Sequence, residues 1–132
     1  MTEAQLTTYF HKFIKAHPRQ DTESYEFKMC KGGSFNFKQV HDHQVVGLLA
    51  SLDGLWHKIA DTVAGNGFTA KKPFDAIYVK AKRAYIVPIF YRERKYKRAI
   101  MIPIQEFVKL SQVGKSVKME ALEKLNFEMF FL

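Results

Sequence analysis

The sequence has little of what disulfide-bonded, thiolate-metal or membrane-spanning proteins require. Cys30 is the single cysteine, which excludes an internal disulfide and a thiolate metal cluster. No apolar run approaches the roughly 18 residues that a transmembrane helix needs. The amino terminus, Met-Thr-Glu-Ala-Gln, lacks the basic start and apolar block of a signal peptide. We therefore expect a protein of the reducing cytoplasm that has no membrane partner.

The common catalytic and metal-binding signatures are also absent. The chain contains no glycine-rich phosphate loop, no Cys/His zinc pattern and no His-Glu-x-x-His helix. His41 and His43 are the only closely spaced histidines, and on a helix their side chains would point apart. No nucleophile-elbow sequence supports a serine hydrolase. Carboxylates and lysines are the groups that remain for chemistry.

Acidic residues are scarce in one segment, and this segment carries the net charge. The chain has 21 Lys and Arg residues and 13 Asp and Glu residues, a net charge of +8. Residues 71–98 contain ten of the basic residues and two acids, Asp75 and Glu93, so the rest has eleven of each sign. Such a concentration of positive charge is typical of a surface that binds a polyanion. The alternative is a solvated basic surface without a partner.

Tyrosines alternate with the basic residues of this segment and can pack on a sugar or an unstacked base. An anionic membrane fits less well, because we expect these residues on strands and loops rather than on an amphipathic helix. We therefore predict DNA as the partner. The predicted nucleic-acid contacts are Lys72, Lys80, Lys82, Arg83, Arg92, Arg94, Lys95 and Lys97.

The chain as a whole has the composition of a folded domain. Hydrophobic residues make up 47% of its 132 residues, which excludes a disordered chain and allows a core of its own. We expect a single domain over residues 1–132.

The amino-terminal half predicts two helices and two strands. Thr2 and Gln5 form a capping box at the start of a first helix. Residues 23–30 alternate with a period of two, which is typical of a strand. A second helix has His41 or Asp42 as its cap and ends at Asp53-Gly54. Residues 55–60 follow as a short strand.

The carboxy-terminal half predicts an antiparallel hairpin. Residues 74–79 and 84–91 are its strands, and a basic connector at 80–83 joins them. After a basic turn at 92–98, Pro103 indicates that the last strand lies at an edge of the sheet. The order of elements predicts an α+β domain with a mixed, mostly antiparallel sheet of four to five strands flanked by helices. We also expect a flexible loop at 61–71 and helices at 105–110 and 115–125, the second of them capped by Ser116. The apolar tail at 127–132 is expected to dock on the body of the protein or on a partner.

Glu26 and Lys28 are two residues apart on the first strand, so they share one face about 7 Å apart. Asp75 opens a later strand. If these strands are neighbours, two carboxylates and a lysine form a site for Mg²⁺ or Mn²⁺ that hydrolyses a phosphodiester. Glu26 and Asp75 would hold the metal, and Lys28 would stabilise the charge of the transition state. The alternative for Glu26 and Lys28 is an ion pair on a solvent-facing strand.

The sequence Pro73-Phe74-Asp75, the expected hairpin and the Glu-x-Lys element resemble the PD-(D/E)XK nuclease superfamily, in particular small phage-type Holliday-junction-resolvase-like proteins. The resemblance covers about residues 25–110, and its motif is short. It implies a restriction-endonuclease-like core and an endonuclease that cleaves duplex or branched DNA with Mg²⁺. It also implies a polar accessory residue on a helix, here Gln44. A phage-encoded protein of this kind would act in the host cell cytoplasm.

The chain departs from the family pattern on its central strand. The family has Glu-x-Lys near residues 87–90, where this chain has Val-Pro-Ile-Phe. Either Glu26 and Lys28 take over this role, with Glu23 as an additional ligand, or Glu93 does so from the following basic run, or the fold has no catalytic activity. The alternative function is a non-catalytic nucleic-acid-binding protein, or a nuclease-like inhibitor, that uses the basic hairpin at 71–98. The apolar tail and the expected edge strand would serve a two-fold dimer on symmetric DNA.

Overall fold

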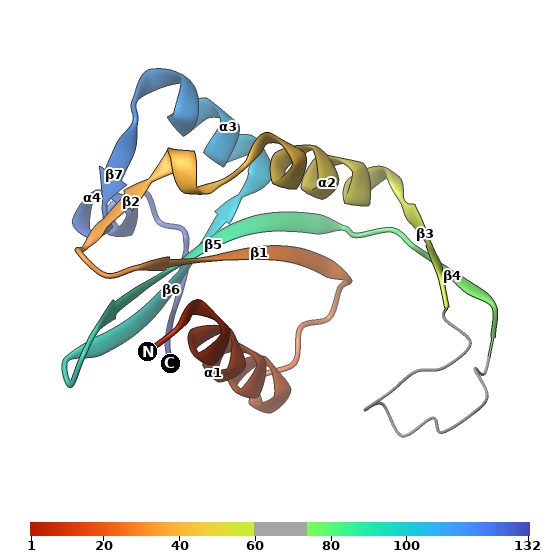
Figure 1. Ribbon diagram of the computed structural model, residues 1–132, viewed down its shortest axis with the longest axis horizontal. Helices are drawn as coiled ribbons and strands as arrows, with labels where there is room; N and C mark the ends of the chain where they lie inside the picture. Colours follow the sequence, from red (N-terminus) through yellow and green to blue (C-terminus); the bar gives the residue numbers. More distant parts are fainter. Residues whose placement is uncertain (60–73) are drawn as a thin grey trace.

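The computed structural model describes residues 1–59 and 74–132 and has an α+β fold (Figure 1). Its main sheet has four strands in the order β1-β5-β6-β8. β1 runs parallel to β5, and the other two pairs are antiparallel. The mixed sheet expected from the sequence is therefore confirmed. Its strands are β1 (Glu23–Cys30), β5 (Arg83–Arg92), β6 (Tyr96–Pro103) and β8 (Glu128–Phe131).

Helices cover both faces of this sheet, so its central strands are buried on both sides. α1 (Glu3–Ala16) lies on one face, and α2 (Asp42–Asp53) and α3 (Ile104–Val113) lie on the other (Figure 1). Successive residues of β5 enter different cores, since Ile86 packs on the α2 side and Val87 on the α1 side. Burial on both faces accounts for the long apolar run of β5.

The local signals of the amino-terminal half are confirmed. Thr2 caps α1, and its N–H donates a hydrogen bond to Gln5 Oε1 (2.8 Å), which completes the capping box. On β1, Tyr25 and the residues that share its face pack toward α1. α2 begins after His41, whose N–H donates to Gln44 Oε1 (3.0 Å).

The hairpin predicted for residues 74–79 and 84–91 is wrong. β4 (Ala76–Val79) pairs with β3 (Leu55–Lys58) in a separate two-stranded sheet, whereas β5 pairs with β1 and β6. The hairpin that forms here is β5–β6, and its turn lies in the basic segment 92–98, as expected. β5 pairs with β1 and β6 rather than with the nearby β4. The reason is that β5 is apolar on both faces, so its neighbours must belong to a sheet that is covered on both sides.

Residues 80–83 connect two sheets instead of forming a hairpin tip. The N–H of Ala81 donates to Ser51 O (2.8 Å), and the N–H of Lys82 donates to Thr22 O (2.8 Å). These two bonds fix the point at which the chain leaves β4 and enters the main sheet. The β3–β4 ribbon, called the arm below, projects from this end of the sheet (Figure 1). The loop expected at 61–71 and the predicted contact Lys72 lie outside the described residues.

The strand expected at a sheet edge is an internal strand. β6 lies between β5 and β8, and Pro103 ends it at the residue before α3. The apolar tail docks on the body, as one alternative held, and forms β8. Both surfaces that we expected to serve a dimer are therefore used within the chain.

The segment 115–125, expected as one helix, is divided. Ser116 begins strand β7 (Ser116–Lys118), which pairs with β2 (Ser34–Asn36), so Ser116 does not cap a helix. The short helix α4 (Met119–Glu123) follows. A 3₁₀ turn, η1 (Phe37–Gln39), leads from β2 toward α2. In the part of the chain that the structure describes, no helix has the length and apolarity to cross a membrane.

Candidate functional site

Glu26 and Lys28 project from the same face of β1, as predicted, and contact each other. Lys28 Nζ lies 3.4 Å from Glu26 Oε1. Gln44, in the first turn of α2, donates from Nε2 to the same carboxylate oxygen (2.8 Å). The Lys28 side chain is 11% exposed and that of Glu26 is 30% exposed, so the group is only partly open to solvent. Three predicted site residues therefore come together between β1 and α2.

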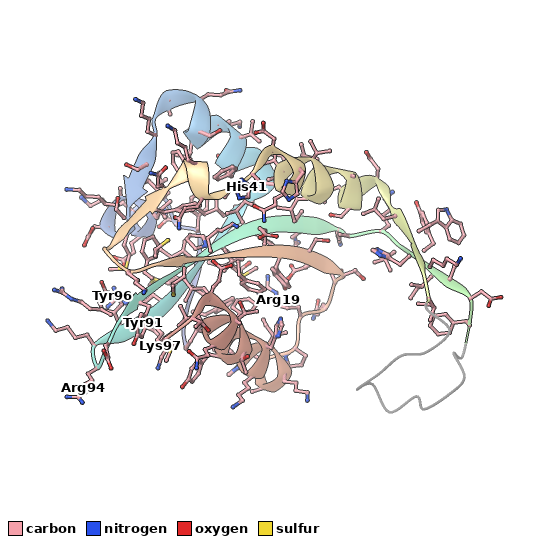
Figure 2. All side chains as sticks on the ribbon, in the orientation of Figure 1. Arg19, His41, Tyr91, Arg94, Tyr96 and Lys97 are labelled. Carbon is pink, nitrogen blue, oxygen red and sulfur yellow. The ribbon has the colours of Figure 1, made fainter. Side chains whose placement is uncertain are left out.

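The same contacts also hold the start of α2 on the sheet. Gln44 uses its amide oxygen for the N–H of His41 and its amide nitrogen for Glu26. His41 lies at the start of α2, above the sheet in Figure 2. One carboxylate faces one ammonium group, so the pair is electrically balanced. The arrangement has a clear structural role in addition to any chemical one.

Asp75 does not join this group through strand pairing. It precedes β4, whose partner is β3 and not β1. Its carbonyl oxygen accepts the N–H of Ile59 (2.8 Å) on the arm, which projects away from the main sheet (Figure 1). The condition for a two-carboxylate site, that Glu26 and Asp75 lie on neighbouring strands, is not met. Among residues 1–59 and 74–132, no group of three or more His, Cys, Asp and Glu side chains is arranged to hold a metal ion.

Glu23 lies on the opposite face of β1 from Glu26, because the two are an odd number of residues apart. Its side chain is 2% exposed and receives hydrogen bonds from Arg19 Nε (2.9 Å) and from the Tyr25 hydroxyl. Burial, together with the neighbouring Glu23 carboxylate, raises the pKa of the Tyr25 hydroxyl, so this hydroxyl stays protonated. Glu23 therefore belongs to a buried ion-pair network and does not supplement the Glu26 group.

The position at which the family pattern has Glu-x-Lys is core in this protein. Val87, Ile89 and Phe90 are fully buried in β5. Glu93 is exposed in the turn that follows β5. It shares no strand with Glu26, so the two carboxylates do not meet through the sheet.

The end of the β5–β6 hairpin carries a group of basic and aromatic side chains, which we call the basic hairpin. Arg94 has a φ of 60°, and the N–H of Lys95 donates to Arg92 O (3.0 Å), which closes a tight turn. Figure 2 shows Arg94 at the tip of this hairpin, at one end of the molecule. A hollow of about 210 Å³ opens between these side chains. It is lined by Tyr91, Arg92, Arg94, Lys95, Tyr96, Lys97 and Leu132.

The charges of the basic hairpin are not neutralised by the body of the protein. Over the described ranges 1–59 and 74–132, no ion pair involves Arg92, Arg94 or Lys95. Lys97 Nζ lies 4.4 Å from the centroid of the Tyr9 ring, a cation–π contact that leaves its charge in place. Arg98 differs, because its guanidinium pairs with Glu123 (2.7 Å), so it serves the fold.

The other predicted contacts, Lys80, Lys82 and Arg83, lie at the far end of β5. Ten residues of extended chain separate the two ends, a span of about 30 Å. Asp21 pairs with Lys82 (3.6 Å) and with Arg83 (3.5 Å), which reduces the positive charge there. Residues 71–98 therefore do not form one continuous basic surface.

The sequence analysis did not predict two basic residues near the hairpin as part of a binding surface. Lys31 follows β1, and Lys118 ends β7, yet both line a cavity together with Arg92. Their neighbours in sequence are not basic-rich, so charge counting gave no signal. The only indication was Gly32-Gly33, which marks a turn next to Lys31.

Comparison of the chain with models of protein families, with curated proteins and with solved structures finds no match. Its function is therefore inferred from its own side chains.

Proposed function

We propose that this protein binds nucleic acid through the basic hairpin and that binding does not depend on catalysis. The observation that supports this most is the set of four cationic side chains, Arg92, Arg94, Lys95 and Lys97, on a protruding turn. Within residues 1–59 and 74–132, none of the first three is in an ion pair. Glu93 is the one acid in this turn, so the four cations leave a net charge of +3. Cations held close together repel each other, and phosphates of a nucleic acid relieve this repulsion.

The shape of the hairpin suits a duplex. The major groove of B-form DNA admits a two-stranded β-ribbon, with basic side chains reaching the phosphates on either side. Tyr91 and Tyr96 line the same hollow as the cations and offer rings to a sugar or an exposed base. Contacts of this kind position a protein on DNA without reading much sequence.

The test is to replace Arg92, Arg94 and Lys95 together by Glu and to measure duplex affinity as a function of salt. The parent is expected to lose affinity with salt at a log–log slope of ~0.9 per phosphate contact. The triple variant should bind all sequences more weakly and with a smaller slope. A control with the same change in charge is Lys15, Lys58 and Lys109 replaced by Glu, all of them exposed, at the end of α1, on the arm and on α3. If the triple variant binds DNA and RNA as tightly as the parent at moderate salt, the proposal is wrong.

A second candidate is a Mg²⁺-dependent endonuclease, and the contact between Glu26, Lys28 and Gln44 is what favours it. Mg²⁺ is often held by one or two carboxylates together with substrate phosphates, and Glu26 would supply one of them. Against it stand the balanced Glu26–Lys28 pair and the pairing of β4 with β3. Cleavage of a plasmid or a four-way junction that needs Mg²⁺ or Mn²⁺, and is lost in both Glu26→Gln and Lys28→Ala, would favour this candidate. Cleavage that persists in both variants would indicate a contaminating nuclease.

A further inference from the structure

A polar cavity of about 510 Å³ lies beside the basic hairpin, between three segments that are distant in sequence. The turn from β1 to β2 forms one wall, the last residue pair before the β5–β6 turn, Arg92 with Tyr96, forms another, and the end of β7 with the start of α4 forms the third. Its lining residues are Lys31, Gly32, Gly33, Ser34, Arg92, Tyr96, Lys118 and Glu120.

Backbone pairing connects these walls, since Cys30 is opposite Phe90 in the parallel β1–β5 pair, just before Lys31 and Arg92. Ser34 is opposite Lys118 in the antiparallel β2–β7 pair, and the N–H of Met119 donates to Gly33 O (2.9 Å). Gly33 has a φ of 72°, a left-handed conformation that glycine adopts at little cost and that turns the chain into β2. The backbone of the cavity walls is therefore fixed by regular pairing and by this turn.

The charges around the cavity are mostly of one sign. Lys31, Arg92 and Lys118 supply three positive charges, and Glu120 supplies one negative charge. None of these three cations forms an ion pair within the part of the chain that the structure describes. A Cβ built on Gly32 meets nothing within 4 Å, so no other part of the described chain covers this turn. An anion is the ligand that this environment favours.

We infer that this cavity binds a phosphate group, and that on a bound nucleic acid it holds a backbone phosphate next to those engaged by the basic hairpin. The inference rests on the proposed function for the source of the phosphate, because Arg92 lies in both places. Donors approach from three walls, which suits the several acceptor oxygens of a tetrahedral phosphate better than the two coplanar oxygens of a carboxylate. Arg92 can donate two parallel hydrogen bonds, and the two lysines act as point charges.

The experiment uses the double variant Lys31→Ala/Lys118→Ala, with Lys15→Ala/Lys109→Ala as a control that removes the same charge elsewhere. All four lysines are exposed, and the fold of each variant is checked by its amide NMR spectrum. Duplex affinity of the cavity variant is expected to fall roughly ten-fold at moderate salt, with a salt slope smaller by about one phosphate contact. The control should retain the slope of the parent. If the parent binds DNA and the cavity variant matches it in affinity and slope, the cavity inference is overturned while the proposed function stands.

A second measurement separates the two sources of phosphate. Inorganic phosphate is titrated into the full chain, and the amide resonances of Gly32 and Gly33 are followed. They are expected to shift in the parent and to stay unchanged in the cavity variant. If phosphate shifts them but no DNA or RNA binds to the parent, the cavity is a site for free phosphate compounds and the proposed function fails. If phosphate moves neither resonance at millimolar concentration, the cavity is not a phosphate site.

Discussion

Cys30 is the only thiol of the chain, and its side chain is 2% exposed at the end of β1. Burial, with a smaller contribution from the Glu3 carboxylate, raises the pKa of the Cys30 thiol to about 12. The thiolate is the reactive form, so the folded protein should react very slowly with a thiol reagent such as DTNB near pH 8. In denaturant, one thiol per chain should react at once. Rapid reaction of the native protein would mean that this end of β1 opens readily.

At the scale of elements, the arm depends on one glycine. Gly54 ends α2 with a φ of 105°, and a Cβ built there would overlap the hydroxyl of Tyr78. Gly54→Ala should therefore cost on the order of 1–3 kcal/mol locally and displace the arm. Trp56 is 75% exposed and is the only tryptophan, and its ring centroid lies 5.2 Å from that of Tyr78. Its fluorescence should thus report the change before the main sheet unfolds.

Gly47→Ala is the matched control for this substitution. Gly47 lies in the middle of α2, and a Cβ there meets nothing within 4 Å. Alanine should stabilise the helix by up to about 1 kcal/mol and leave the Trp56 emission unchanged. Equal effects of Gly54→Ala and Gly47→Ala on the emission would contradict the role assigned to Gly54.

At the scale of the whole molecule, Arg19 connects the two edge strands of the main sheet. It donates to Glu23 on β1 and to Glu128 on β8, at 2.6 Å for the Arg19 Nη1–Glu128 Oε2 pair. The hydrogen bonds from Arg19 to Glu128 lower the pKa of the Glu128 carboxyl below its ordinary value of 4.5. The ionised form is therefore favoured in the folded state. The ionised Glu128 carboxylate therefore contributes fully to the free energy of unfolding above pH 4.5, the ordinary pKa. This contribution is lost as the pH falls through the lowered pKa that Glu128 has in the folded protein.

Urea unfolding of the parent and of Glu128→Gln between pH 7 and about pH 3 measures this contribution. The free energy of unfolding should be higher in the parent at neutral pH, and the difference should shrink as the pH falls. The Glu128 side chain is 48% exposed, so solvent screening keeps the difference modest. A difference that is independent of pH would show that the Arg19–Glu128 contact does not act through ionisation.

The sequence by itself determined the elements whose signals are local. The capping box of Thr2 and Gln5, the period of two in β1 and the glycine after α2 each depend on residues within one or two turns of chain. The same period placed Glu26 and Lys28 on one face, and the count of charges located the basic turn at 92–98. These features follow from backbone geometry that neighbouring residues impose on each other.

Only the tertiary structure decided which strands pair. Residues 76–79 and 83–92 are both β-rich, and nothing in their own composition tells that one pairs with β3 and the other enters between β1 and β6. Pairing is chosen by how much apolar surface each arrangement buries, and this depends on residues far away in the chain. The same choice separated Asp75 from Glu26 and brought Lys31 and Lys118 to Arg92. A site assembled from three distant segments has no local pattern, because its members meet only when the sheet has formed.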